Sequence, residues 1–163
     1  MEKNKANLDA TFSKKVPKRN MKTIYIASDH AGITMKKALK ELLEKINYKV
    51  HDLGPQTDDS VDYPDYAKKL AKAVKSRPDS KGILICGTGI GMCMAANKIK
   101  GIRAALCYNE DTARLSREHN DANILCLGAR TTTLNMAKKI TVAWLETKHE
   151  GGERHQRRIK KIG

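Results

Sequence analysis

Apolar and polar positions alternate along this chain with two different periods. Short apolar runs, within KTIYIAS, GILIC and NILCL, are typical of strands that are buried on both faces of a sheet. Longer segments between them carry apolar residues every three or four positions, and the first has Leu39, Leu42, Leu43 and Ile46 on one face. This second period is typical of helices with one buried side. The alternation of the two predicts parallel βαβ units.

The pattern predicts a single domain of strands and helices. The strands are expected at residues 22–28, 48–53, 82–86, 102–107 and 123–127. The helices are expected at residues 33–46, from Pro64 past Val74, and at residues 91–99, 110–118, 133–147 and about 153–162. The fold class is therefore α/β: a three-layer, doubly wound (Rossmann-like), five-stranded parallel sheet with a C-terminal helix. Right-handed crossovers restrict the topology, and we expect the strand order 2-1-3-4-5.

Residues 1–20 follow neither period; they are polar and end in Lys-Arg-Asn. We expect a disordered basic N-terminal extension there, with the compact domain at residues 21–163. No apolar run reaches the ~18 residues that a membrane helix needs, and the start of the chain lacks the apolar segment of a secretory signal. The four cysteines form no C-x-x-C pair and are expected to be free thiols. These features favour a cytoplasmic protein without a membrane partner.

The net charge of +14 raises the question of nucleic-acid binding. Residues 1–20 carry +4 and residues 146–163 carry +3, so half of the excess lies at the two ends. The sequence has neither aromatic residues interleaved with the basic ones, for stacking on bases, nor zinc-finger spacing. The charge therefore favours solvated lysine faces and sites for an anionic small molecule over a nucleic-acid groove.

Polar residues gather where the predicted strands end. In doubly wound sheets, ligands bind beyond the carboxyl ends of the strands, near the point where the strand order reverses. Ser28-Asp29-His30-Ala31-Gly32 closes the first strand, and Cys86-Gly87-Thr88-Gly89-Ile90-Gly91 closes the third. These two strands are neighbours in the expected order. The sequence therefore places Asp29, His30, Cys86 and Thr88 in one crevice.

The glycine-rich loop after Cys86 can bind an anion, because glycines let consecutive backbone N–H groups converge and the next helix adds a partial positive charge. A dinucleotide loop would need glycine in place of Met92 and should follow the first strand. A P-loop would need Gly-Lys-Ser/Thr at its end. An alternative for Cys86 alone stays open: the glycines allow close packing, and Cys86 is a small buried apolar residue.

Several motifs together resemble those of the ribose-5-phosphate isomerase B family. They are Asp29-His30-Ala31-Gly32, DYPDYA at residues 62–67, GILICGTGIG at 82–91, AANK at 95–98, GIRA at 101–104, SREHND at 116–121, and EGG at 150–152 followed by RHQRR at 154–158. The resemblance runs from Met21 to about Ile162, in the family's order. The family also includes galactose-6-phosphate and allose-6-phosphate isomerases.

The resemblance implies an aldose–ketose isomerase of the pentose phosphate pathway, which interconverts ribose 5-phosphate and ribulose 5-phosphate through a cis-enediolate. It implies no cofactor and no metal. The alternative substrate is a six-carbon sugar phosphate, either allose 6-phosphate or galactose 6-phosphate. A non-catalytic binder of nucleotides or nucleic acid, suggested by charge alone, is the remaining alternative.

Site roles follow from the resemblance, residue by residue. The catalytic residues are Cys86 as the base, His119 as the acid that opens the sugar ring, Asp29 as the group that binds or deprotonates the hydroxyl, and Thr88 as a proton shuttle. The substrate-binding residues are Asp29, His30, Gly87, Thr88, Gly89, Ile90, Gly91, Asn120, Arg130, Arg154 and Arg158. The backbone amides from Gly87 to Gly91 form the oxyanion hole, and His30 with the three arginines binds the phosphate.

The resemblance also implies a homodimer, or a dimer of dimers, with shared active sites. His119, Asn120 and Arg130 are expected to reach the Cys86 loop of the partner chain. One departure from the family's pattern is Glu153, which is inserted between Gly152 and the first arginine of the C-terminal motif. Arg154 and Arg158 keep their i, i+4 spacing, which puts both on one side of a helix.

Overall fold

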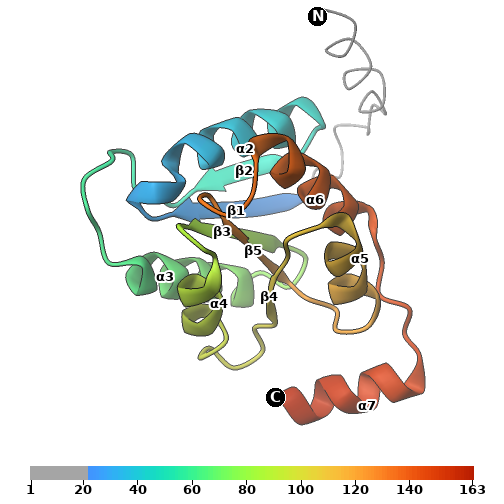
Figure 1. Cartoon of the computed structure of the whole chain (residues 1–163). Coiled ribbons are helices and arrows are strands. Elements are labelled where there is room, and N and C mark those ends of the chain that lie inside the picture. Colours follow the sequence, from blue (N-terminus) through green and yellow to red (C-terminus); the bar gives the residue numbers. More distant parts are fainter. Residues whose placement is uncertain (1–21) are drawn as a thin grey trace, which may run out of the picture.

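The structure, a computed structural model, describes residues 22–163 (Figure 1). The extension expected at residues 1–20 lies outside the described residues. A five-stranded sheet forms the centre of the described part, and all of its neighbouring strands are parallel. The strands are β1 (Thr23–Ser28), β2 (Lys49–Asp52), β3 (Lys81–Cys86), β4 (Ala104–Leu106) and β5 (Ile124–Gly128).

Helices cover both faces of this sheet. They are α2 (Ile33–Lys45), α3 (Tyr63–Lys75), α4 (Ile90–Ala96), α5 (Glu110–Glu118), α6 (Leu134–Glu146) and α7 (Glu153–Ile162), with a short 3-10 turn, η2 (His30–Gly32). One buried cluster joins the sheet to α2, α5 and α6, and a second joins it to α3 and α4. Figure 1 shows α2 and α6 on one side of the sheet, with α3 and α4 on the other. The three-layer, doubly wound prediction is confirmed.

Alternation along β3 decides which layer receives each side chain. Ile83 and Ile85 join the cluster under α2 and α6, where Trp144 is completely buried. Leu84 and Cys86 belong to the opposite cluster, under α3 and α4. Successive residues of a strand point to opposite faces, so a run of consecutive apolar residues is what a sheet covered on both sides requires. Cys86 therefore ends β3 on the α3–α4 side.

The strand order is β2-β1-β3-β5-β4, which corrects the expected order 2-1-3-4-5 at one edge. All five residues of β5 are buried, whereas the three residues of β4 are only partly buried. The longer and wholly apolar strand takes the interior position beside β3, and the short strand takes the edge. As a result, Cys86 pairs with Gly128 at the end of β5.

The helix boundaries match the expected ones within one residue, except that α4 ends at Ala96 instead of residue 99, and α7 spans residues 153–162 as expected. This last helix lies apart from the sheet in Figure 1. His155 is the one buried residue of α7, and Ile162 is 59% exposed. Within residues 22–163, no helix has both the length and the apolar composition to cross a membrane.

Candidate active site

Asp29 directly follows β1 and lies against the carboxyl end of β3. The Asp29 backbone N–H donates to the carbonyl of Ile85 at 3.0 Å. Its buried carboxylate accepts hydrogen bonds from the N–H groups of Ala31 at 2.9 Å and Gly32 at 3.2 Å. A β-carbon at Gly32 would lie 2.8 Å from the Ile85 carbonyl oxygen, so only glycine permits this approach. The Asp-His-Ala-Gly motif thus fixes the direction of the Asp29 carboxylate.

Cys86 is buried at the end of β3, with 5% of its surface exposed. Its sulfur accepts a hydrogen bond from the Gly89 N–H at 3.1 Å. Gly89 has a φ of +79°, and a β-carbon there would lie 3.0 Å or less from the backbone of Leu127. Glycine is therefore required at this position. The resulting turn directs a backbone amide at the sulfur, where it would stabilise negative charge.

The loop that follows leaves polar groups open to solvent. The Thr88 side chain is exposed, and its hydroxyl oxygen accepts a weak hydrogen bond of 3.4 Å from the Ile90 N–H. Tyr63, at the start of α3, packs against the loop, because a β-carbon at Gly91 would lie 2.6 Å from the tyrosine ring. Tyr63 is 41% exposed. The sequence contained it within DYPDYA, but gave it no role.

His30 and Arg130 complete this group. The His30 ring is partly buried, and its Nδ1 atom has no hydrogen-bond partner within residues 22–163. The Arg130 N–H donates to the Gly87 carbonyl at 2.8 Å, and a β-carbon at Gly87 would lie 3.3 Å from Arg130 Nη1. Arg130 thus lies on the Cys86 loop of its own chain. It does so because β5 adjoins β3. That Arg130 also reaches the loop of a partner chain stays a prediction.

A second group forms where α5 ends. The ring of His119 stacks on the ring of His155 from α7, with their centroids 4.4 Å apart and their planes 7° from parallel. The Arg154 Nε–H donates to His155 Nε2 at 3.2 Å. Burial and the charges of His119, Arg154 and Arg158 lower the pKa of His155, which favours the neutral ring that can accept this bond.

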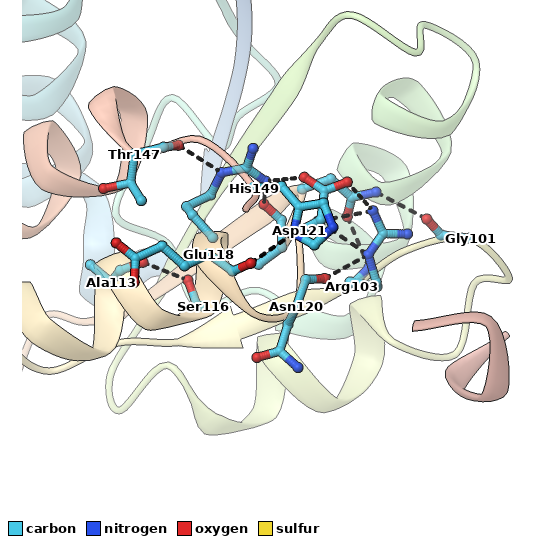
Figure 2. A network of polar contacts seen from close by, with 12 residues as sticks. Gly101, Arg103, Ala113, Ser116, Glu118, Asn120, Asp121, Thr147 and His149 are labelled. Carbon is cyan, nitrogen blue, oxygen red and sulfur yellow. Dashed lines mark hydrogen bonds and ion pairs between the residues drawn. The ribbon is translucent and has the colours of Figure 1, made fainter. Parts of the chain in front are cut away.

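Two arginines anchor the turn that carries His119 and Asn120. Arg103 donates to the carbonyl of Asn120 and to the carboxylate of Asp121, and Arg117 bonds the other carboxylate oxygen of Asp121 at 2.7 Å. In Figure 2 the Asn120 side chain points away from this network. His149 Nδ1 lies 2.7 Å from the Glu118 carbonyl oxygen and so contacts the end of α5. The Asn120 amide is consequently free to contact a ligand.

The two groups lie at opposite ends of the strands: the first is at their carboxyl ends, and the second is near their amino ends. Gly82 pairs with Ile124 at the start of β5, and Cys86 pairs with Gly128 at its end. At ~3.3 Å per residue, the four steps between these pairs span ~13 Å. We call Asp29, His30, Cys86, Thr88 and Arg130 the Cys86 half-site, and we call His119, Asn120, Arg154 and Arg158 the His119 half-site. One chain brings together the members of each half-site, but it does not bring His119 to Cys86.

The second group contains three possible metal ligands. His119, Glu150 and His155 each offer one ligand atom, and these atoms lie within 4.8 Å of one another. However, the two imidazoles stack face to face, and the Arg154 guanidinium bonds the Nε2 atom of His155. A cation would meet a fixed positive charge at that atom. The group therefore suits an anion better than a metal ion.

The fold and the two half-sites define the class of protein: a doubly wound α/β protein with a thiol, a carboxylate and several cations arranged for acid–base chemistry on a small anion. A profile of the family described as Ribose/Galactose Isomerase matches residues 24–162. The chain belongs to this family, and the resemblance found in its motifs is confirmed.

Individual relatives agree with the family match. The chain is 52% identical over 141 residues to a probable ribose-5-phosphate isomerase B of Mycoplasma genitalium, covering 85% of this chain and 92% of the relative. It is 44% identical over 142 residues to ribose-5-phosphate isomerase B of Escherichia coli, and the match covers 87% of this chain and 95% of that relative. A solved structure of the Mycoplasma genitalium enzyme with bound ribulose-5-phosphate matches with a TM-score of 0.84 and 51% identity. The match covers 88% of this chain and 95% of that one.

Proposed function

We propose that this protein is a ribose-5-phosphate isomerase, which interconverts ribose 5-phosphate and ribulose 5-phosphate through a cis-enediolate in the pentose phosphate pathway. The observation that carries the proposal is the position of Cys86. Its sulfur lies at the end of β3, at 3.1 Å from a loop amide and in the same half-site as the Asp29 carboxylate. Aldose–ketose isomerisation needs a base beside the carbon acid and donors for the developing oxyanion.

Each residue of the Cys86 half-site has a role in this reaction. Cys86 removes the proton from C2 of the aldose and returns it to C1. The amides of the loop from Gly87 to Gly91 bind the enediolate oxygens, and Thr88 moves a proton between them. Asp29 takes the proton of the anomeric hydroxyl when the furanose ring opens. His30 and Arg130 bind the phosphate, for which a guanidinium offers two parallel hydrogen bonds.

The His119 half-site supplies the remaining groups from a second chain. His119 gives its proton to the ring oxygen, Asn120 holds the sugar, and Arg154 with Arg158 binds the phosphate. The proposal therefore includes a homodimer, or a dimer of dimers, with shared active sites. It is supported by the positions of the half-sites at opposite ends of the strands, which are ~13 Å long between Gly82 and Cys86, and by the exposed surface of α7. Free thiols at all four cysteines suit a reducing compartment and support a cytoplasmic location.

A comparison of substrates tests this function. We expect kcat/KM for ribose 5-phosphate to exceed the values for allose 6-phosphate and galactose 6-phosphate, all measured under the same conditions. A higher value for either six-carbon sugar would reassign the substrate within the family. Absence of turnover with all three, in a folded protein, would refute the isomerase assignment itself.

A further inference from the structure

A basic cavity of ≈ 660 Å³ lies at the amino ends of the strands, on the opposite side of the sheet from the carboxyl ends that carry Cys86. Its walls come from residues at or just before the starts of β1, β3, β4 and β5, and from Arg117 on the last turn of α5. Five cationic side chains line it: Lys22, Arg77, Lys81, Arg103 and Arg117. They converge because the amino ends of parallel strands meet at one edge of a sheet. A cavity of this size matches those that bind small molecules, which are typically about 300–1,000 Å³.

The carboxylates in the cavity do not neutralise these cations. Asp121 is shared between Arg103 and Arg117, at 3.0 Å and 2.7 Å. Asp79, the other carboxylate of the lining, forms no ion pair with any residue of the described part of the chain. Lys22, Arg77 and Lys81 likewise form none within residues 22–163. The cavity thus retains an excess of positive charge.

Lys81 shows the electrostatic consequence. Burial, followed by the charges of Arg117 and Lys22, lowers its pKa to about 8, and Asp121 offsets only part of this effect. Its ammonium group lies 5.0 Å from the centre of the Trp144 ring, which adds a weak cation–π attraction. A bound anion would relieve the repulsion among these cations, and it would be less screened here than on an open surface.

We propose that this cavity binds a phosphorylated small molecule with at least two anionic groups, at a site separate from that of the substrate. Lys22, Arg77 and Lys81 are its ligands, because Arg103 and Arg117 are already bonded to the turn that carries His119. One phosphate would leave most of the ≈ 660 Å³ empty.

Isothermal titration of the full chain with inorganic pyrophosphate, at fixed ionic strength, tests the proposal. The variant Arg154→Gln/Arg158→Gln removes two phosphate ligands of the proposed active site and should retain this binding. The variant Arg77→Gln/Lys81→Met should bind at least tenfold more weakly. A matched control, Lys68→Met/Lys72→Gln, removes two exposed lysines of α3 outside the cavity and should bind within twofold of the wild type.

Trp144 is the only tryptophan of the chain and provides an independent readout. Because Lys81 and Arg117 both face its ring, pyrophosphate should change its fluorescence in the wild type and in Arg154→Gln/Arg158→Gln. The single variant Arg77→Gln keeps Lys81 and should shift the midpoint of this fluorescence change to a higher pyrophosphate concentration. Binding that disappears in Arg154→Gln/Arg158→Gln, or that is unchanged in both cavity variants, would overturn the proposal. None of these measurements depends on isomerase activity.

Discussion

The imidazole ring of His155 lies flat against that of His119, with 4.4 Å between their centroids. His155 belongs to α7 and is 5% exposed, whereas His119 ends α5 and is partly exposed. The buried ring therefore sets the orientation of the exposed one. Since positive charge at His119 lowers the pKa of His155, the two rings resist being protonated together.

His155 is accordingly a positioning residue for the proposed ring-opening acid. We expect His155→Ala to lower kcat/KM for the cyclic substrate by about tenfold or more, because a small misplacement of a catalytic group is costly. His155→Phe keeps a flat ring at this position and should recover part of the loss. The pH dependence of kcat/KM should also change, since both variants remove a titratable neighbour of His119. Equal losses in the two variants with an unchanged pH profile would assign His155 a purely structural role.

Cys86→Ala should reduce kcat by about 10²–10⁴-fold while leaving substrate binding largely intact, because it removes the proposed base. Cys93 provides a matched control on the next helix. A hydrogen bond from Cys126 lowers the pKa of Cys93 to about 7, so this thiol ionises readily. However, its sulfur bonds the Ala104 carbonyl at 3.3 Å, on the side of β4. We expect Cys93→Ala to retain kcat within about threefold. Near-normal turnover by Cys86→Ala would exclude Cys86 as the base.

The sequence predicted the Cys86 half-site more fully than the His119 half-site. Carboxyl ends of neighbouring parallel strands must meet, so the motifs after β1 and β3 were sufficient to place Asp29 near Cys86. The order of β4 and β5 was missed, although the buried run ILCLG at residues 124–128 is longer than its competitor AAL at 104–106. The observed order also places Arg130, which follows β5, beside the Cys86 loop of its own chain, and the expected order did not.

The basic cavity could not be predicted from sequence, because its cations come from separate segments. Lys22 and Arg103 directly precede β1 and β4, Lys81 begins β3, and Arg117 lies on α5. In the sequence they are part of a charge excess spread over many helices and loops. Only the three-dimensional arrangement shows that they face one another with few carboxylates between them. The stacking of His155 on His119 could not be predicted for the same reason, because α5 and α7 are far apart in the sequence and meet only in the folded chain.

Lys81 should make the free energy of unfolding depend on pH. Its pKa is about 8 in the folded chain and 10.5 in the unfolded reference. Between these values the folded chain binds fewer protons, so the free energy of unfolding rises with pH. Below about pH 8 the charged Lys81 side chain lowers the free energy of unfolding by about 1–3 kcal/mol. This loss exceeds the ~0.5–1 kcal/mol of stabilisation expected from the Trp144 contact.

Lys81→Met should therefore raise the free energy of unfolding at pH 7 by about 1–3 kcal/mol and reduce its increase between pH 8 and 10. Urea denaturation of the wild type and the variant at several pH values measures both effects. Lys68→Met, an exposed control on α3, should change neither by more than about 0.5 kcal/mol. A Lys81→Met variant that is less stable at pH 7, with an unchanged pH slope, would contradict this account of Lys81.

Complementation between inactive chains tests whether the two half-sites meet across an interface. Cys86→Ala and His119→Asn chains should each lose most of their activity, for different reasons. In a mixed dimer, one site receives both altered residues and the other receives neither, so the second site should be intact. After subunit exchange at equal concentrations, we expect recovery of about a quarter of the wild-type activity, because about half of the dimers are mixed and each has one working site. Native mass spectrometry of the mixture verifies the exchange. Confirmed mixed dimers without recovered activity would show that Cys86 and His119 do not serve one site from two chains.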